Sequence, residues 1–288
     1  METRFFSKES HARNSFHFHD TNEILLIMSE GKEFHVRNKI YTPTRGSMFI
    51  LNNTDMHRSV PKEGTLYQFY SIRFYPEEAA GLSAPEFNLQ ACFLEHEEFI
   101  HRKQLSGDQL DHLLKLINKA EYYLSADCSA YGKQVFIRTL LAEILVYVNF
   151  LYKTPERVPE TLESDITKIQ PVIDYIDKNI LDDLSLDRLA RECYMNKYYL
   201  SHRFKEIMGM PLSEYITTRR LAEAKAFLRR GLTVTMSGEQ SGFNSSSHFI
   251  RTFTKREGIS PKQYAKQYMQ IDTYLSSHAP HRSGLGLV

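Results

Sequence analysis

The chain has 288 residues, of which 42% are hydrophobic and 25% are charged, and its formal net charge is +1. This composition is that of a folded protein of about two domains, and it excludes a disordered chain and a disulfide-stapled scaffold. A cysteine-based zinc site is not expected either, because the three cysteines lie far apart at Cys92, Cys128 and Cys193. No signal peptide is recognisable and no apolar run approaches about 18 residues, so we expect a cytoplasmic protein without a membrane span.

Residues 1–100 have the texture of strands after a polar start. Residues 1–15 show no period and are expected to form an extended lead-in. From Phe16 onward, short apolar runs are separated by Gly-, Asn- and Pro-containing turn signals. The runs are Ile24–Met28, Phe34–Val36, Met48–Leu51 and Leu66–Phe74. Many short strands at this spacing predict a small ligand-sensing β-barrel or jelly roll.

Four polar residues of this region have the side chains of a metal site or a ligand pocket, namely His17, His19, Glu23 and His57. In an alternating strand, His17 and His19 point to the same face, as two ligands of one ion must. Three imidazoles and a carboxylate could hold a divalent transition metal. The set resembles that of the cupin barrel, where two His, a carboxylate and a third His converge on the lumen.

Two other interpretations of these four residues are favoured over a metal, because suitable residue types do not show a converged geometry. The residues could line the pocket of a small organic ligand, or they could be hydrogen-bonded structural groups. No cofactor is therefore expected, and a divalent metal is the less favoured possibility. Further side chains would suit a sugar or an anion if the strand register turned them inward: Arg37, Arg45, Tyr67, Tyr70 and Arg73.

Residues 101–154 change to a helical period. Their apolar residues form two stripes, Leu110 to Leu124 and Val135 to Val148, separated by residues 127–132. Each stripe needs a partner surface. They could pack on the barrel or pair with a second subunit, and both alternatives stay open. Residues 155–164 have the composition of a linker to a domain at 165–270, and residues 271–288 are expected to form a flexible tail.

Two short helices with a tight turn between them are predicted for Leu184–Gly209. Ser185 and Asn196 are candidate N-caps, and Gly209 is a candidate C-terminal residue. A second unit of the same shape follows one linker helix later. Leu200, Phe204, Gly209 and Tyr215 recur 49 positions downstream as Phe249, Phe253, Gly258 and Tyr264. Such a repeat predicts two helix-turn-helix units at a fixed separation.

The positive charge of the chain is concentrated in this repeat. Residues 196–266 contain 13 Lys and Arg against 5 Asp and Glu, whereas the rest contains 23 against 30. A basic block of net charge +8 in a near-neutral chain is the footprint expected for binding a polyanion. Combined with two helix-turn-helix units, it predicts double-stranded DNA as the partner.

Residues 166–268 resemble the DNA-binding domain of the AraC/XylS family of bacterial transcription regulators. The matching segments are YLSHRFKEIMGMPLSEYI, RRLAEAKAFLRRG and GFNSSSHFIRTFTKREGISPKQY. The barrel is similar to the sensor half of such regulators, and residues 101–154 to their dimerisation segment. The fold class is therefore α+β with two domains, an N-terminal cupin-like barrel with a helical segment and a C-terminal all-α domain. The resemblance implies a homodimeric regulator, more often an activator than a repressor, that responds to a small-molecule effector such as a sugar and acts with RNA polymerase.

Burial of Leu200, Phe204, Phe249 and Phe253 would leave the opposite faces of the two reading helices for DNA. The residues on those faces are Lys197, Tyr198, Ser201, His202, Arg203, Lys205, Ser246, Ser247, His248, Arg251 and Lys255. Arg251 is the strongest candidate for a bidentate guanine contact, worth about 1–3 kcal/mol of discrimination. Helix capping is an alternative role for Ser246 and its neighbour Ser245.

One segment departs from the family pattern, because Ser237, Gly238 and Ser241 stand where apolar residues and an Ala are usual. A Gly inside a helix costs about 0.5–1 kcal/mol relative to Ala. We therefore expect the second unit to be less stable than the first, or ordered only on DNA. The alternative function for the whole chain is a metal-dependent cupin enzyme with an accessory DNA-binding domain, but no second catalytic group is evident and an enzyme is not expected.

Overall fold

The computed structural model describes residues 1–9, 16–94, 101–125, 127–153, 162–163 and 165–276. The expected linker at 155–164 and the expected tail at 271–288 fall largely outside these ranges. The described residues form two compact units. The first comprises Met1–Ile173 and Asn196–Pro211, and the second comprises Asp174–Met195 and the described part of Leu212–Val288.

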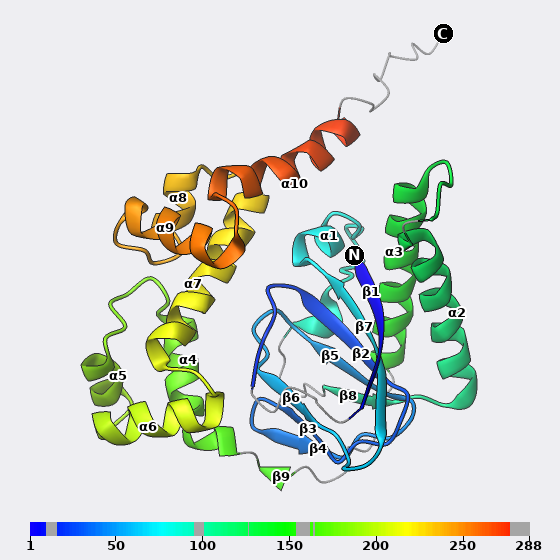
Figure 1. Cartoon of the computed structure of the whole chain (residues 1–288). Helices are drawn as coiled ribbons and strands as arrows, with labels where there is room; N and C mark the ends of the chain where they lie inside the picture. Colours follow the sequence, from blue (N-terminus) through cyan, green and yellow to red (C-terminus); the bar gives the residue numbers. More distant parts are fainter. Residues whose placement is uncertain (10–15, 95–100, 126, 154–161, 164, 277–288) are drawn as a thin grey trace. The chain divides into compact units, whose positions relative to one another are not determined.

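The first unit contains a five-stranded antiparallel sheet in the order β1-β7-β2-β5-β8 (Figure 1). Its strands are β1 (Glu2–Glu9), β7 (Leu66–Phe74), β2 (Asn22–Ile27), β5 (Ser47–Leu51) and β8 (Arg102–Gln104). Three of the four predicted apolar runs are thus confirmed as β2, β5 and β7, and the fourth, Phe34–Val36, lies in β3 (Glu33–Val36) of the second sheet. The expected lead-in is corrected, since residues 2–9 form strand β1, which pairs with β7 along its whole length. The residues that pair with β1 lie 57 positions (Glu9 with Leu66) to 71 positions (Glu2 with Arg73) away, so no local pattern predicts this strand.

A second sheet has four strands in the order β6-β3-β4-β9. They are β6 (His57–Val60), β3 (Glu33–Val36), β4 (Lys39–Tyr41) and β9 (Leu162–Glu163). Every pairing in both sheets is antiparallel. The cupin-like barrel that was predicted for this half of the chain therefore consists of two antiparallel sheets.

Strand β2 is buried along its whole length because both of its faces meet a core. Leu25 and Ile27 belong to a cluster with residues of β3, β4, β5 and β7, which fills the space between the two sheets. Ile24 and Leu26 belong to a second cluster on the other face of the five-stranded sheet, together with helical residues. The two-residue period of a strand thus divides one apolar run between two cores.

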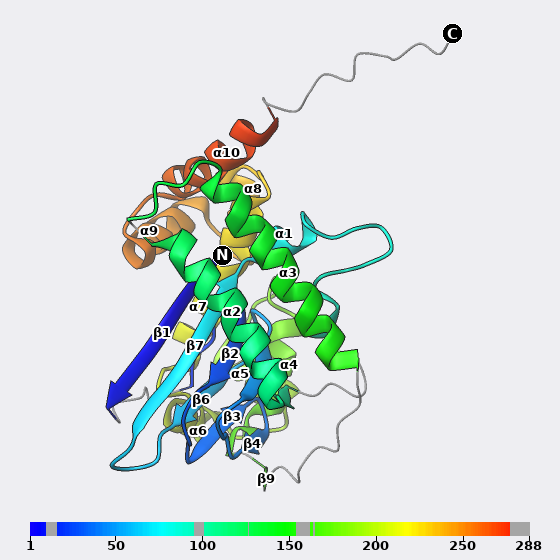
Figure 2. The same ribbon diagram turned by 90° about the vertical axis from the view of Figure 1, so that its right-hand side faces the viewer.

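Two long helices, α2 (Gly107–Leu124) and α3 (Lys133–Lys153), cover that second face. They lie side by side across the sheet that contains β1, β7 and β2 (Figure 2). Ser106 begins α2 with a capping box, since its hydroxyl accepts from the Gln109 backbone while the Gln109 side chain accepts from the Ser106 backbone. Two short helices, α1 (Pro76–Ala80) and η1 (Ala91–Phe93), complete this layer.

Helix α3 is long and apolar enough to cross a membrane by length and composition alone, and it is the one such helix among the described residues. Its inner face packs in the core with α2 and the sheet, through Leu141, Ile144 and Val148. Packing on the barrel, one of the two alternatives left open for the apolar stripes, is therefore found for these residues. Val135 and Phe150 are 65% and 62% exposed and form part of an outer apolar face.

Residues 165–276 are helical except for short connections. The helices are η2 (Asp165–Lys168), α4 (Gln170–Lys178), α5 (Leu186–Glu192), α6 (Lys197–Met208), α7 (Leu212–Arg229), α8 (Val234–Glu239), α9 (Ser246–Glu257) and α10 (Pro261–Ser276). They confirm the predicted all-α domain, with α7 as the linker helix. The segment before the first predicted unit is divided into η2 and α4, and the first helix of the second predicted unit, α8, ends at Glu239.

The core of the second compact unit, which contains α7, α8, α9 and α10, is aromatic. Phe249 and Phe253 of α9 pack edge-on against each other and contact Phe243 and Tyr264. Aliphatic residues of α7, including Leu221 and Leu228, complete the cluster. The connection between α4 and α5 is tied to α7 by Arg220, which donates to the carbonyls of Ile180 and Asp182. Arg219, only 5% exposed, pairs with Asp177 at 2.9 Å.

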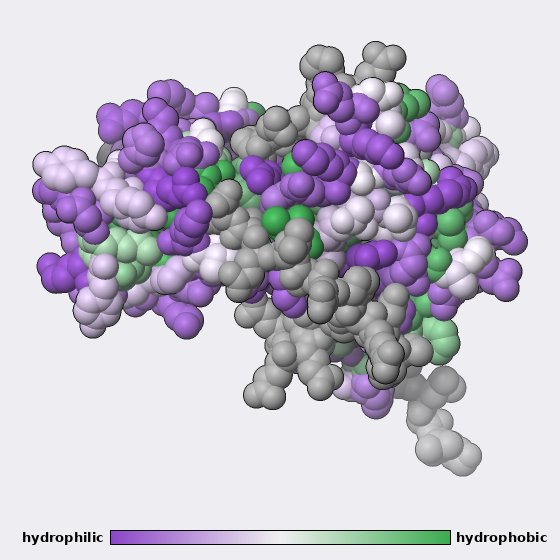
Figure 3. Space-filling model, turned by 90° about the horizontal axis from the view of Figure 1, so that it is seen from below, coloured by the Kyte–Doolittle hydropathy of each residue, from purple (hydrophilic) through white to green (hydrophobic). Residues whose placement is uncertain are grey.

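The face of the molecule drawn in Figure 3 is mostly hydrophilic, and its hydrophobic side chains lie in small separate patches. Singly exposed apolar residues of this kind are ordinary on a folded protein.

Candidate ligand pocket and nucleic-acid interface

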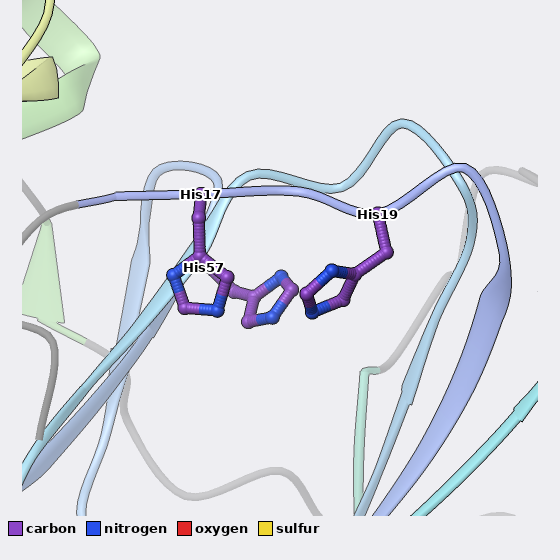
Figure 4. A group of neighbouring side chains, drawn as sticks. All are labelled: His17, His19 and His57. Atoms are coloured by element: carbon purple, nitrogen blue, oxygen red, sulfur yellow. The ribbon is translucent and has the colours of Figure 1, made fainter. Parts of the chain in front are cut away.

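Three histidines of the barrel converge on one point. His17 and His57 form an isolated antiparallel bridge through two backbone hydrogen bonds of 3.0 and 2.9 Å. Their rings lie 4.4 Å apart between centroids, and the ring of His19 lies 5.2 and 5.4 Å from those of His17 and His57 (Figure 4). One nitrogen from each ring lies within 4.8 Å of the others. The expected strand over residues 17–19 is absent apart from this bridge, yet both side chains still point to the same place.

Glu23 lies beside the rings of His19 and His57 because of the register of β2. It shares a strand face with Leu25 and Ile27, which line the space between the sheets. Its Oε2 is 3.6 Å from His19 Nε2 and 3.5 Å from His57 Nε2. The structure thus brings together all four residues that the sequence had grouped.

The opposite oxygen of Glu23 is held by strand β7. Arg73 is directly opposite Glu23 in the register of β2 and β7, and its Nε donates to Glu23 Oε1 at 3.2 Å. The Ser71 hydroxyl donates a short hydrogen bond to the same oxygen. Sequence analysis proposed Arg73 as a pocket residue but missed Ser71. The polar positions 71 and 73 within the apolar run of β7 were the available signal, since they alternate with Ile72 and Phe74.

His57 is oriented by the loop that precedes it. Its Nδ1 is 2.9 Å from the carbonyl of Asp55, so Nδ1 carries the proton and donates it to that oxygen. The Asp55 side chain is fully buried, accepts from the Asn52 backbone at 2.8 Å, and forms a short ion pair with Arg37. Arg37 therefore supports the pocket from behind instead of lining it. Asp55 was not identified from the sequence, because only the folded loop aims its carbonyl at His57.

The other side chains that were considered for the pocket lie in different places. Arg45 is exposed and donates to the carbonyl of Met28 at 3.3 Å. Tyr67 is buried in the cluster between the sheets. Tyr70 is half-buried and packs with the cluster on the outer face of the five-stranded sheet. Strand register, which sequence does not determine, decides all three positions.

The ionisation of the pocket follows from burial and neighbouring charge. Burial lowers the pKa of His19 to about 4, although the carboxylate of Glu23 opposes the shift. Burial likewise lowers the pKa of His57. Burial alone would raise the pKa of Glu23, but His57, His19, Arg73 and the Ser71 hydroxyl outweigh it and hold that pKa at about 2. At neutral pH the pocket therefore holds an ionised carboxylate beside neutral imidazoles.

Helix α6 presents most of its predicted reading residues to solvent. Asn196 caps it, accepting from the backbone of Tyr198 and Tyr199, and Gly209 ends it with a left-handed φ of 73°. Leu200 and Phe204 are buried, as predicted. The exposed predicted residues are Lys197, Tyr198, Ser201, His202 and Lys205. Arg203 is half-buried and pairs with Glu206 at 2.7 Å.

A cavity of about 390 Å³ lies beside this helix. It is lined by Lys168, Tyr199, His202, Arg203 and Glu206. Two cationic side chains, Lys168 and Arg203, are among the five, so η2 adds a basic residue that sequence analysis did not associate with α6.

Helix α9 has the same construction. Ser245 caps it by accepting from the backbone of His248, and Gly258 ends it with a φ of 76°. The capping role that was considered for Ser245 is confirmed, whereas Ser246 is half-buried in the first turn. The remaining predicted residues are exposed, namely Ser247, His248, Arg251 and Lys255. Within the described residues, Arg251 has no ion-pair partner, so its guanidinium is available to a ligand.

Both halves of the chain match known families. An AraC-like ligand binding domain matches residues 2–132, and a helix-turn-helix domain matches residues 189–267. An uncharacterized HTH-type transcriptional regulator of Staphylococcus aureus strain COL is 25% identical over 255 residues, which are 86% of this chain and 32% of that protein. The HTH-type transcriptional regulator YtdP of Bacillus subtilis is 37% identical over 97 residues, 33% of this chain and 13% of its own length. The chain thus spans about a third or less of these curated relatives.

Solved structures give two kinds of match. A protein from Listeria innocua is 30% identical and covers 35% of this chain and 96% of its own, with a TM-score of 0.33. Wild-type ToxT from Vibrio cholerae, solved with an unsaturated fatty acid bound, is 15% identical and covers 92% of this chain and 94% of its own, with a TM-score of 0.38.

Proposed function

We propose that this chain, which belongs to the AraC/XylS family of DNA-binding transcription regulators, binds promoter DNA through α6 and α9 and adjusts that binding to a ligand held in its barrel. The observation that carries the proposal is the repeated construction of the two helices. Each has 12 residues, a polar N-cap, a left-handed glycine at its end, buried aromatic or leucine residues on one side and exposed polar residues on the other.

The chemistry of the exposed residues suits a duplex. Arg251 can donate two hydrogen bonds to one guanine, while the Tyr198 and His248 rings can contact thymine methyl groups. Lys197, Lys205 and Lys255 suit phosphates, whose contacts position a protein without reading sequence. Arg203 can contact a phosphate only if its ion pair with Glu206 breaks. Two such helices in successive major grooves would be spaced by about 34 Å, one helical turn of DNA.

The barrel and the α2–α3 layer supply the regulatory part of the proposal. A buried, ionised Glu23 beside neutral imidazoles gives the barrel a polar site that could bind and orient a small polar ligand. The exposed apolar residues of α3, such as Val135, Val146 and Phe150, suit a homodimer contact. By family membership the chain would act in the cytoplasm with RNA polymerase, most often as an activator. A sugar is one candidate effector.

A second candidate function is metal-dependent catalysis in the barrel, and the convergence of His17, His19 and His57 is the observation that favours it. This candidate predicts turnover of a small molecule that is lost when His57 is replaced. If the chain is a transcription regulator, replacing His57 should instead change DNA binding and should not affect any turnover.

The decisive experiment compares Arg251 with Arg256, which lies on the same helix but is ion-paired with Glu214 at 2.8 Å. A duplex selected from a random pool by the full-length chain serves as the probe in fluorescence anisotropy. Arg251→Ala should weaken binding to that duplex by about 1–3 kcal/mol and relax selection at one base pair. Arg256→Ala removes the same charge and should leave the selected sequence unchanged.

Raised salt should weaken binding steeply in all variants if phosphate contacts contribute as proposed. The proposal is wrong if no duplex is enriched over random competitor, or if both arginine variants have the same effect on sequence selection.

A further inference from the structure

We propose that His17, His19, His57 and Glu23 form the binding site of a single divalent transition-metal ion of the zinc class. The inference concerns the barrel alone, so it stands whether or not the ion is the signal that the regulator reads. It starts from three imidazole nitrogens within 4.8 Å of one another, supplied by two segments that a backbone bridge clamps together (Figure 4).

The hydrogen bond behind His57 determines which nitrogen faces the cluster. Because Nδ1 donates to the Asp55 carbonyl at 2.9 Å, Nε2 is the nitrogen that faces the cluster, and in the neutral imidazole it presents its lone pair. A carbonyl that fixes the tautomer of an imidazole from behind is the usual support of a metal-ligating histidine. The loop before His57 therefore presents this ring as a ligand.

The lone pair of His57 Nε2 faces the Glu23 carboxylate at 3.5 Å. Two electron-rich atoms opposite each other repel unless a cation lies between them. His19 Nε2 is 3.6 Å from the same oxygen and, among the described residues, has no hydrogen-bond partner. One cation placed among the three atoms would satisfy them together.

The distances fit an ion better than they fit direct hydrogen bonds. Hydrogen bonds between nitrogen and oxygen span about 2.7–3.2 Å, so 3.5 and 3.6 Å are too long. Bonds of about 2.0–2.1 Å from zinc to four tetrahedral ligands place neighbouring ligand atoms about 3.4 Å apart. The two distances to Glu23 Oε2 lie close to that value, and the three imidazole nitrogens lie within 4.8 Å of one another.

Glu23 is held as a ligand with a single free oxygen. Ser71 and Arg73 occupy Oε1, which leaves Oε2 for the ion. Three imidazole nitrogens and one carboxylate oxygen suit Zn²⁺, Co²⁺ or Ni²⁺, whereas Mg²⁺ prefers an all-oxygen shell. The half-buried side chains of His17 and His19 leave a path for the ion to enter.

The test is metal binding by the full-length, untagged chain after dialysis against a chelator. Titration with CoCl₂ should give one equivalent per chain, with the intense visible absorption of four-coordinate cobalt, and ZnSO₄ should displace it. Millimolar MgCl₂ should leave the cobalt bound. Saturating Zn²⁺ should raise the Tm of the barrel by about 5 °C or more.

Four variants make the test specific. His19→Gln and Glu23→Gln should each weaken Co²⁺ binding by about 100-fold or more, the larger end of the effects of altered metal-site residues. His57→Ala should abolish Co²⁺ binding. If this buried substitution prevents folding, His19→Gln still tests the site, because His19 is only half-buried. His35→Gln is the matched control, because His35 is also buried in the barrel but pairs with Glu33 at 2.8 Å, outside the cluster. It should bind like the wild type.

Less than one equivalent of cobalt in the wild type would overturn the proposal. So would a folded His19→Gln variant, with an unchanged Tm in chelator, that binds cobalt as tightly as the His35→Gln control.

Discussion

The two helix pairs of the C-terminal half, α5–α6 and α8–α9, have similar capping residues at their helix ends but different residues between them. Ser185 and Thr233 cap their first helices, and Asn196 and Ser245 cap their second helices. These caps and the two terminal glycines recur at matching positions because each satisfies backbone groups that a helix end leaves free. The residues between the caps obey packing instead, and there the pairs diverge.

The first divergence is Ala190 against Gly238, each of which lies five residues after the N-cap of its first helix, Ser185 and Thr233. A Cβ at Gly238 would lie 2.8 Å from the Phe249 ring, closer than carbon atoms approach. The residue of the first pair that matches Phe249 is the smaller Leu200, and there an Ala stands at the matching position. The glycine that looked like a defect in the sequence is therefore the complement of a large ring.

The second divergence is the turn before the reading helix. Both turns use a left-handed residue at matching positions, Tyr194 with a φ of 54° and Gly242 with a φ of 89°. A Cβ at Gly242 would lie 2.4 Å from the Ile180 carbonyl, so glycine is required there. Tyr194 is 97% exposed and meets only the intrinsic penalty of its conformation.

The serines of α8 also have individual explanations. Ser241 is fully buried, but its hydroxyl donates to the carbonyls of Ser237 and Gly238 at 2.7 and 3.0 Å. The Ser237 hydroxyl is buried and has no hydrogen-bond partner among the described residues. Ser237 therefore carries the penalty of a buried hydroxyl without a hydrogen bond, and Ser241 does not. The lower stability of the second pair stays a prediction.

The largest effect is expected for Gly242→Ala. The new methyl group combines a backbone clash with a strained φ, so the second pair should lose about 2–5 kcal/mol of stability. Hydrogen exchange of the α8 and α9 amides measures the loss locally. Gly258→Ala is the control, since its φ of 76° is similar but nothing lies within 4 Å of its Cβ. It should lose only about 1–2 kcal/mol. Equal losses would show that the close approach to Ile180 is unimportant.

Gly238→Ala should come next, at about 1–3 kcal/mol of destabilisation, because overpacking against Phe249 outweighs the better helix propensity of Ala. The double variant Gly238→Ala/Phe249→Leu copies the first pair and should recover part of the loss. A coupling free energy of about 1 kcal/mol between the two sites, from urea unfolding of all four chains, would support the size complementarity. Strict additivity would contradict it.

The smallest effect should be a gain. Tyr194→Gly removes the penalty of about 1–2 kcal/mol that a non-glycine residue has in the left-handed conformation. It also increases the conformational entropy of the unfolded chain, which opposes that gain. We expect a net stabilisation of about 0.5–1 kcal/mol, measured from the urea midpoint. Tyr198→Gly, at an exposed helical position two residues after the N-cap Asn196, should destabilise the protein by about 1 kcal/mol. If both glycines destabilise alike, Tyr194 contributes contacts that outweigh its strain.

The sequence by itself determined the helix ends, the repeat of 49 positions and the apolar faces of α6 and α9. These features depend on backbone hydrogen bonds and on the helical period, which act within a few residues. It also grouped His17, His19, Glu23 and His57 by residue type, and strands β2, β5 and β7 by their apolar runs.

Only the tertiary structure decided what those four side chains face. Their convergence needs the bridge of His17 with His57, and the register that places Arg73 opposite Glu23, 50 positions away. The same holds for strand β1, for the support that Asp55 gives to His57, and for the need for glycine at position 238. Pairing and packing between distant segments depend on the whole fold, and a shift of one residue in the register of β2 would turn Glu23 to the opposite face of the sheet.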